Sequence, residues 1–226
     1  MITFTDIDGV LLTSPCIGAE FAKFLLEKDL LSKKRWEFMK SSYRSYKKGG
    51  SYKKIIKAWN SGFREALSGK KINTINNLIN EFEKGVRLKK LPYTDELINF
   101  LKQKGPVLGV TAAIPQIVHI SNQYLNLDDI LGLRLLSKKD NRYVVNKDLD
   151  EHNFKKHIVN RYKTNEKIIA LGDSVHDVPM LKKADIPIAL NPDHELSKVA
   201  KKKNWEIITK DEDVLDKVKN LVNENE

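Results

Sequence analysis

Short apolar runs alternate with helix-like segments through the second half of the sequence, and this alternation limits the possible folds more than any other feature. After Pro92, runs typical of buried strands are separated by segments in which apolar residues recur every three or four positions. The predicted strands are 107–111, 130–136, 143–145, 168–171, 186–190 and 206–208, and the predicted helices are 94–104, 114–125, 153–162, 178–184, 194–203 and 214–222. Such alternation predicts an α/β fold, a doubly wound parallel sheet with helices on both faces. Within it, 143–145 is a candidate antiparallel partner of the strand before it, across a turn at 138–141.

The first predicted strand, Ile2–Thr5, is separated from the others by a long helical stretch. From about residue 14 to residue 88, aromatic and aliphatic residues follow helical spacing in four successive stripes. The stripes are Phe21, Phe24 and Leu25; Trp36, Met39, Tyr43 and Tyr46; Ile55, Ile56, Trp59, Phe63 and Leu67; and Ile72, Ile75, Leu78, Ile79 and Phe82. Four such helices can pack as a small bundle. We therefore predict a Rossmann-like core of residues 1–14 and 89–226, interrupted by an inserted all-α helical bundle of residues 15–88.

The charge of the chain bears on its partners. The net charge is +10, but only seven of the 40 basic residues are arginine, the residue that phosphate and base recognition favours. The basic positions are spread along the sequence on what we expect to be solvated helix faces. This pattern argues against a dedicated nucleic-acid-binding function and favours attraction of anionic small molecules.

Sequence features also bear on where the protein works. No run approaches the roughly 20 apolar residues that a membrane-spanning helix needs, so we expect no membrane partner. The first predicted strand begins at Ile2, so we expect no signal peptide before it. Cys16 is the single cysteine, so a disulfide framework is excluded and a reducing cytoplasm is expected. The sequence gives no indication of the oligomeric state.

Acidic and hydroxyl side chains stand where three of the predicted strands end. Asp6 and Asp8 follow the first strand, and Thr111 ends the strand 107–111. Asp173 and Asp177 follow the strand 168–171. Ligands of doubly wound folds bind beyond the carboxyl ends of the strands. We therefore expect four carboxylates and one hydroxyl to converge at a single edge of the sheet.

Four clustered carboxylates need a compensating charge. At an effective dielectric constant near 20, two carboxylates about 4 Å apart repel each other by roughly 4 kcal/mol. A hard divalent cation removes this repulsion, and Mg²⁺ is typically held by one or two carboxylates together with phosphate oxygens of a substrate. Lys155 or Lys156, near the start of its predicted helix, could supply a further positive charge. The arrangement suits phosphoryl transfer, in which a carboxylate can act as the nucleophile.

The order of these motifs resembles a known family. Asp6-Ile7-Asp8-Gly9-Val10, Thr111 after an apolar strand, a helical lysine and Gly172-Asp173-Ser174-Val175-His176-Asp177 are similar to the four motifs of the haloacid dehalogenase-like phosphatases. The helical insertion after the first motif resembles the cap of the phosphoserine phosphatase-like branch. The resemblance covers the whole predicted core, and it implies a Rossmann-like core with a helical cap domain.

The resemblance implies catalytic and metal-binding roles. Asp6 would attack phosphorus and carry an aspartyl-phosphate intermediate. Asp8 would protonate the leaving alcohol and then activate water, and its backbone carbonyl would be a metal ligand. Asp173 would bind Mg²⁺ together with Asp6, and Asp177 would support the acidic site through water or the lysine.

It also implies a phosphate-binding set. Thr111 and the backbone amide of Ala112 would hold phosphate oxygens, and Lys155 would neutralise their charge. We favour Lys155 over Lys156 because of its spacing from the apolar residues that follow on the same helix, although both remain candidates.

The expected function is that of a Mg²⁺-dependent phosphatase acting on an anionic small-molecule phosphomonoester. Two alternatives remain, a phosphoserine phosphatase proper and a phosphotransferase that passes the phosphoryl group to an acceptor alcohol. In the family's phosphoserine phosphatases the second motif is Ser-Gly-Gly and a Glu follows the first motif, whereas this chain has Thr111-Ala112-Ala113 and, near the expected Glu, Pro15-Cys16. Glu20 could replace that Glu, and Arg64 of the cap is a candidate for reading the leaving group.

Overall fold

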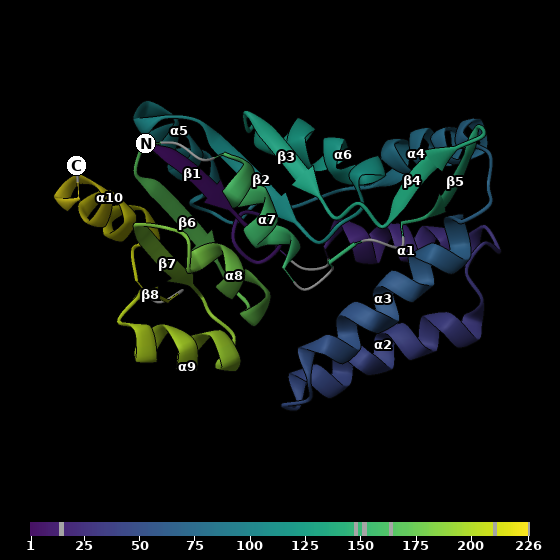
Figure 1. Ribbon diagram of the computed structural model, residues 1–226, viewed down its shortest axis with the longest axis horizontal. Helices are drawn as coiled ribbons and strands as arrows, with labels where there is room; N and C mark the ends of the chain where they lie inside the picture. Colours follow the sequence, from purple (N-terminus) through teal and green to yellow (C-terminus); the bar gives the residue numbers. More distant parts are fainter. Residues whose placement is uncertain (14–15, 147–148, 151–152, 163–164, 210–211, 226) are drawn as a thin grey trace.

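A parallel sheet of six strands forms the centre of the molecule in the computed structural model (Figure 1). The structure describes residues 1–226 except 14–15, 147–148, 151–152, 163–164, 210–211 and 226. The strands, in their order across the sheet, are β3 (Asp129–Gly132), β2 (Val107–Thr111), β1 (Ile2–Thr5), β6 (Ile168–Gly172), β7 (Ile186–Leu190) and β8 (Glu206–Ile208), and all neighbours run parallel. The predicted doubly wound parallel sheet is confirmed.

The helices of the core pack on this sheet in two groups. They are α5 (Thr94–Lys104), α6 (Pro115–Leu125), α7 (Phe154–Arg161), α8 (Val178–Leu181), α9 (His194–Lys203) and α10 (Val214–Glu224), and a 3₁₀ turn, η1 (Val175–Asp177), leads into α8. Helix α5 contacts α6 and α10, whereas α7 contacts α8. Side chains that face the helices, such as Phe4 and Leu171, are fully buried. No helix in the described part of the chain is long and apolar enough to cross a membrane.

Strand β1 lies in the middle of the sheet, between β2 and β6, although β2 begins about a hundred residues later in the sequence. Thr5 pairs with Gly109 on one side and with Leu171 on the other. The sheet order therefore reverses at β1, and the residues after β1, β2 and β6 emerge next to one another at the same edge.

The region after β3 differs from the prediction. The expected strand 130–136 is wrong in extent, because β3 ends at Gly132 and a separate strand, β4 (Leu136–Lys139), begins four residues later. Strand β4 pairs antiparallel with β5 (Arg142–Val145), as predicted for 143–145. The two residues of the connecting turn, Asp140 and Asn141, have φ of 49° and 57°, a conformation typical of tight hairpin turns. The hairpin is separated from the main sheet at residues 133–135, where the backbone N–H of Leu133 donates to the carbonyl of Ala113 over 2.9 Å and that of Leu135 to the carbonyl of Leu133 over 2.8 Å.

The inserted segment folds into the four helices that the stripes predict, α1 (Ile17–Glu27), α2 (Lys33–Lys47), α3 (Tyr52–Leu67) and α4 (Ile72–Gly85). Helices α2 and α3 form a pair that lies beyond the carboxyl edge of the sheet (Figure 1). Helices α1 and α4 contact α6 of the core. The ring of Phe21 on α1 lies 6.2 Å from that of Phe63 on α3 and 5.0 Å from that of Phe82 on α4. The insertion thus has its own aromatic contacts and is also anchored on the core.

The two connections between core and insertion run side by side. Leu12 forms an antiparallel bridge with Lys90, and the backbone N–H of Thr13 donates to the carbonyl of Lys89 over 2.8 Å. The predicted boundary at residues 14 and 15 lies outside the described residues. The division into a core of 1–14 and 89–226 and a cap of 15–88 therefore stays a prediction.

Candidate active site

Asp6 directly follows the central strand β1. Its backbone N–H donates to the carbonyl of Leu171 on β6 over 2.9 Å, and its own carbonyl accepts a hydrogen bond from the Thr5 hydroxyl at 2.8 Å. Only 8% of its surface is exposed. The sheet thereby fixes the Asp6 backbone and holds its carboxylate in a largely buried position at the carboxyl edge.

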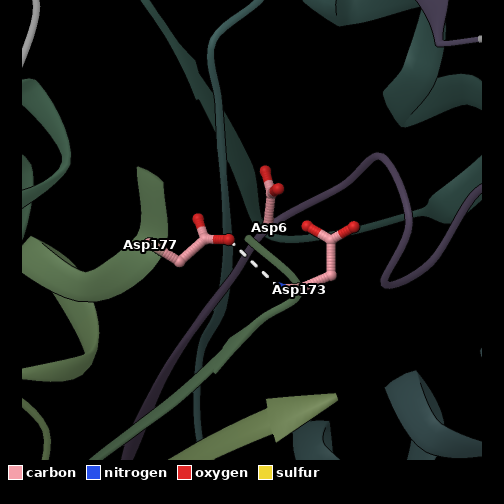
Figure 2. Close-up of side chains that lie close together, drawn as sticks. All are labelled: Asp6, Asp173 and Asp177. Carbon is pink, nitrogen blue, oxygen red and sulfur yellow. Dashed lines mark hydrogen bonds between the residues drawn. The ribbon is translucent and has the colours of Figure 1, made fainter. Parts of the chain in front are cut away.

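Three carboxylates from two neighbouring strand ends meet at this edge (Figure 2). One oxygen each of Asp6, Asp173 and Asp177 lies within 4.8 Å of the other two. The register of β1 and β6 accounts for this proximity, because Thr5 pairs with Leu171 and the backbone leaves the sheet shortly after each of these residues. The convergence that the sequence predicts for these side chains is present in the structure.

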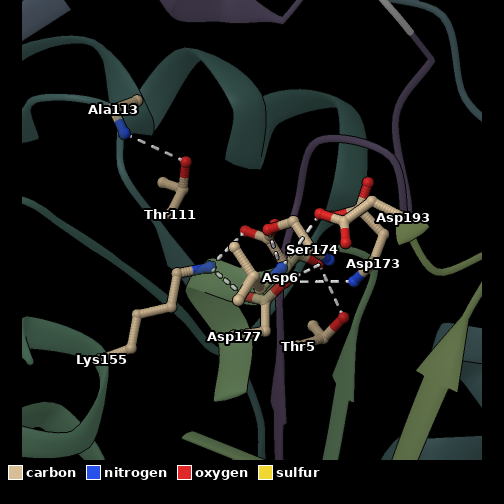
Figure 3. Close-up of polar contacts among 10 residues, drawn as sticks. Thr5, Asp6, Thr111, Ala113, Lys155, Asp173, Ser174, Asp177 and Asp193 are labelled. Carbon is tan, nitrogen blue, oxygen red and sulfur yellow. Dashed lines mark hydrogen bonds and ion pairs between the residues drawn. The ribbon is translucent and has the colours of Figure 1, made fainter. Parts of the chain in front are cut away.

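Lys155 on α7 lies among the carboxylates (Figure 3). Its Nζ is 2.8 Å from Oδ1 of Asp6 and 2.5 Å from Oδ1 of Asp177, and its surface is 1% exposed. Lys156 is half-buried and lines a surface pocket with Lys182 and Lys183. Of the two candidate lysines, the structure brings Lys155 to the carboxylates.

Asp177 organises the loop that carries Asp173. Its Oδ2 accepts hydrogen bonds from the backbone N–H of Asp173 at 3.1 Å, from the backbone N–H of Ser174 at 3.0 Å and from the Ser174 hydroxyl at 3.2 Å. These bonds form a capping box around η1. The fully buried Asp177 side chain therefore joins Lys155 to the backbone of the loop.

Gly9 leaves room for Asp173. Its φ is +89°, a left-handed conformation that favours glycine. A Cβ at this position would lie 2.0 Å from Oδ2 of Asp173, far inside van der Waals contact. The glycine after the two aspartates of the first motif is thus required both by its backbone conformation and by the approach of a carboxylate from another strand.

Burial and mutual repulsion shift the acidity of the carboxyl groups. Burial, and then the charge of Asp177, raises the pKa of Asp6 to about 7, although Lys155 opposes the shift. Burial raises the pKa of Asp8 to about 6. The pKa of Asp173 lies well above its usual range because of burial and the nearby Asp6 and Asp177. For Lys155, burial alone would lower the pKa, but Asp177 and Asp6 outweigh it and raise the pKa.

The residues present fit a hard divalent cation. Four carboxyl groups, on Asp6, Asp8, Asp173 and Asp177, face a single buried ammonium group in the described contacts, so negative charge is in excess. The donor atoms are oxygens, which Mg²⁺ prefers over nitrogen and sulfur. A cation at the cluster would offset the repulsion that raises the carboxyl pKa values.

The remaining predicted phosphate-binding residues lie at the end of β2. Thr111 is 2% exposed, and its Oγ1 accepts a hydrogen bond from the backbone N–H of Ala113 at 3.1 Å. Ala112 is exposed.

Oδ1 of Asp8 is buried and has no hydrogen-bond partner among the described residues, so this oxygen is available to a proton or a bound group.

The two candidate specificity residues come from the insertion. Glu20 lies in the first turn of α1 and Arg64 in the last turn of α3, and both are half-buried. Their roles toward a substrate stay predictions.

The structure also reveals residues that the sequence reasoning missed. Asp193 accepts hydrogen bonds from the backbone N–H of Val175 at 3.0 Å, from that of Leu196 at 2.7 Å and from the Tyr46 hydroxyl on α2. Its own N–H donates to the carbonyl of Asp173 over 2.7 Å. An aspartate just before a predicted helix is a recognisable N-cap, but its bonds to two other segments leave no sequence signal.

Aromatic rings continue this link between the insertion and the site. The rings of Tyr46 and Tyr52 lie 5.3 Å apart, Tyr52 and His176 are 5.3 Å apart, and His176 and Phe154 are 5.2 Å apart. Burial, and then the charges of Asp177, Asp6 and Asp173, raise the pKa of Tyr52 well above its usual value. The Tyr52 side chain of α3 thus lies in the field of the acidic cluster.

Known proteins resemble this chain in sequence or in fold. The family described as haloacid dehalogenase-like hydrolase matches residues 3–182, and no curated protein matches the sequence. A protein with unknown function from Bordetella pertussis Tohama I shares 18% identity at a TM-score of 0.67, with 92% of this chain and 97% of that chain covered. A phospho-aspartyl intermediate analogue of phosphoserine phosphatase shares 20% identity at 0.61, with 96% and 97% covered. Cytosolic 5′-nucleotidase IIIB bound to cytidine shares 16% identity at 0.62, with 98% and 84% covered. At these identities the solved structures show a shared fold.

Proposed function

The chain belongs to the haloacid dehalogenase-like hydrolase family, and from this premise we propose that it is a Mg²⁺-dependent phosphatase that hydrolyses a small phosphomonoester through a phosphorylated Asp6. The observation that carries the proposal is the meeting of Asp6, Asp173 and Asp177 within 4.8 Å, with the buried Lys155 between Asp6 and Asp177. Phosphoryl transfer needs a positioned nucleophile and positive charge beside the transferring group; Asp6 would supply the nucleophile, and Lys155 together with a cation held by the carboxylates would supply the charge.

In the first half-reaction a carboxylate oxygen of Asp6 attacks phosphorus, and the bond between phosphorus and the ester oxygen breaks. The Asp8 carboxyl group donates its proton to the departing oxygen, so the leaving group departs as an alcohol. A pKa of about 6 suits this task, because part of the Asp8 population carries a proton near neutral pH. Lys155 and the Thr111 hydroxyl offset charge on the phosphoryl oxygens.

In the second half-reaction Asp8, now a carboxylate, takes a proton from a water molecule, and the resulting oxygen attacks the phosphorus of phosphorylated Asp6. The bond between phosphorus and Asp6 breaks, inorganic phosphate leaves, and both carboxyl groups return to their starting states. Asp6, Asp173 and the backbone carbonyl of Asp8 would hold Mg²⁺. When bound, the ion supplies positive charge to the carboxylates and to the phosphate oxygens.

Residues 15–88 would act as the cap that selects the leaving group and excludes water. The contacts of Tyr46 with Asp193 and of Tyr52 with His176 support this role, because they bring α2 against the segment after β7 and α3 against the segment after β6. Structures similar in fold include both a phosphoserine phosphatase and a nucleotidase, so we propose the class of small anionic phosphomonoesters.

The experiment that tests the proposal measures phosphate release from a panel of phosphorylated amino acids, sugars and nucleotides, with Mg²⁺ or with EDTA. We expect Asp6→Asn to lower turnover by at least about 10²-fold, the lower range for losing a key catalytic group. The matched control is Asp29→Asn, because Asp29 is an exposed residue with φ of 53° that asparagine readily adopts. Retained turnover in Asp6→Asn would refute the nucleophile, and added acceptor alcohols that collect the phosphoryl group would indicate a phosphotransferase.

A further inference from the structure

The excess positive charge of the chain is concentrated in one part of the fold. Residues 32–68, which comprise α2, α3 and the loop between them, form a unit that we call the basic hairpin. They contain 11 Lys and Arg and 2 Asp and Glu, a net charge of +9, whereas the rest of the chain has 29 and 28, a net charge of +1. The sequence predicts scattered basic residues, but their excess lies almost entirely in the helix pair beyond the carboxyl edge of the sheet (Figure 1).

Most of these charges are exposed and uncompensated. The exposed basic side chains of the basic hairpin are Lys33, Lys34, Arg44, Lys47, Lys48, Lys53, Lys54 and Lys57. None of them pairs with a carboxylate within the described residues. Both acidic residues of the basic hairpin are already used, since Glu65 pairs with Arg35 at 2.8 Å and Glu37 with Lys40 at 2.6 Å. The surface therefore presents a field of one sign.

Aromatic rings are interspersed among these cations. Phe38 and Tyr43 are the large apolar side chains that the described part of the chain leaves exposed, at 50% and 42%, and both lie on α2. The Nζ of Lys47 is 5.5 Å from the centre of the Tyr43 ring, and that of Lys40 is 5.4 Å from the half-buried Trp36. An exposed ring beside an unpaired cation, as Tyr43 is beside Lys47, can stack on a base while the cation contacts a phosphate.

We propose that the basic hairpin is a docking surface for single-stranded nucleic acid. Helix α2 alone places basic residues over about 21 Å, from Lys33 to Lys47, which exceeds the reach of a small phosphorylated molecule and suits a chain of phosphates. Several bases and phosphates of one strand can contact this surface at the same time.

The geometry of α2 favours a flexible strand over an anionic membrane. Its apolar face, with Met39 and Tyr46, is buried, and the face turned to solvent is charged. Phe38 and Tyr43 are five positions apart and therefore point about 140° away from each other around the helix. A flat bilayer cannot take up both rings at once, whereas a single strand can bend around the helix and stack on each.

The test is the binding of a fluorescent single-stranded oligonucleotide of about 20 nucleotides to the full chain, measured by anisotropy at several salt concentrations. The hairpin variant combines Lys47→Gln, Lys48→Gln, Lys53→Gln and Lys54→Gln. The matched control removes the same charge from exposed lysines of α9 and combines Lys198→Gln, Lys201→Gln, Lys202→Gln and Lys203→Gln. Equal thermal unfolding temperatures establish that both variants are folded.

We expect the hairpin variant to bind at least tenfold more weakly than the wild type and the control to bind within about twofold of it. The slope of log affinity against log salt should decrease by about 0.7 for each phosphate that the variant no longer neutralises, or by about 3 for four phosphates. Tyr43→Ala should weaken binding about fivefold or more because its ring no longer stacks on a base.

Equal losses of affinity in the two lysine variants would overturn the proposal, because net charge alone would then account for binding. Binding to phosphatidylserine vesicles without binding to the oligonucleotide would overturn it in favour of a membrane surface. The readout is binding, so the result is independent of whether the proposed phosphatase activity is found.

Discussion

Removal of the buried ammonium group of Lys155 is the change whose cost follows most directly from the structure. Lys155→Met keeps a chain of similar length but leaves Asp6 and Asp177, at 2.8 Å and 2.5 Å from Nζ, without their cation. Breaking a buried ion pair by removing one partner costs about 3–5 kcal/mol, because the remaining charge stays in the interior. For a domain of this size, each kcal/mol corresponds to roughly 2–4 °C in the midpoint of thermal unfolding. We expect that midpoint to decrease by roughly 6–20 °C.

The assay is thermal unfolding in EDTA, followed by circular dichroism, at about pH 8 and about pH 5. Burial and Asp177 already raise the pKa of Asp6 to about 7, and loss of Lys155 removes the charge that lowers it. A carboxyl group whose pKa is raised on folding destabilises the folded state as the pH rises above its unfolded value. The decrease should therefore be smaller at about pH 5, where the folded protein can hold the proton.

Lys156→Met is the matched control, because Lys156 is the next residue on α7 but is half-buried and lies outside the carboxylate cluster. A surface change of this kind is usually worth less than about 0.5 kcal/mol. If Lys155→Met unfolds at the same temperature as Lys156→Met, the argument that Lys155 compensates buried charge is wrong.

Three further predictions concern the same site. Gly9→Ala should cost about 1–3 kcal/mol of stability and most of the activity, because the φ of +89° disfavours a side chain and a Cβ would lie 2.0 Å from Oδ2 of Asp173. Denaturant unfolding and phosphate release measure the two effects, and wild-type values in both would contradict the prediction. Tyr46→Phe should lose the hydrogen bond to Asp193, worth about 1 kcal/mol, and should raise KM more than it lowers kcat, as steady-state kinetics would reveal. Unchanged kinetics would argue against a role of this contact in holding the cap over the site. Mg²⁺ at about 100 times its Kd should stabilise the wild type by about 2.7 kcal/mol, and Asp173→Asn should abolish the gain; equal gains in thermal shift would exclude Asp173 as a ligand.

The features of the fold that depend on local sequence pattern can be predicted from the sequence. Strand ends carry Asp6, Thr111 and Asp173, and parallel strands bring their ends to one edge, so the pattern of strands alone predicts that these side chains converge. The split between β3 and β4 is not visible in the apolar run, because it depends on residues 133–135 leaving the sheet, where the backbone N–H of Leu133 donates to the carbonyl of Ala113 and that of Leu135 to the carbonyl of Leu133.

Features that depend on contacts between segments far apart in the sequence cannot be predicted from local pattern. Asp193 looks like an ordinary helix N-cap, and nothing near Tyr46 indicates that its hydroxyl reaches that carboxylate 147 positions away. The net charge of residues 32–68 can be counted from the sequence, but only the packing of α2 against α3 places their basic residues on one surface.

The hydrogen-bonded neighbours Leu12 and Lys90 have an evolutionary consequence. Because the polypeptide departs from the core and returns to it at adjacent rungs, the register of the central strands does not depend on what is spliced between these positions. The segment between these positions could therefore be exchanged for another of different length or shape while the acidic cluster at the sheet edge keeps its geometry. The inserted helices are then the part of the fold that is free to vary.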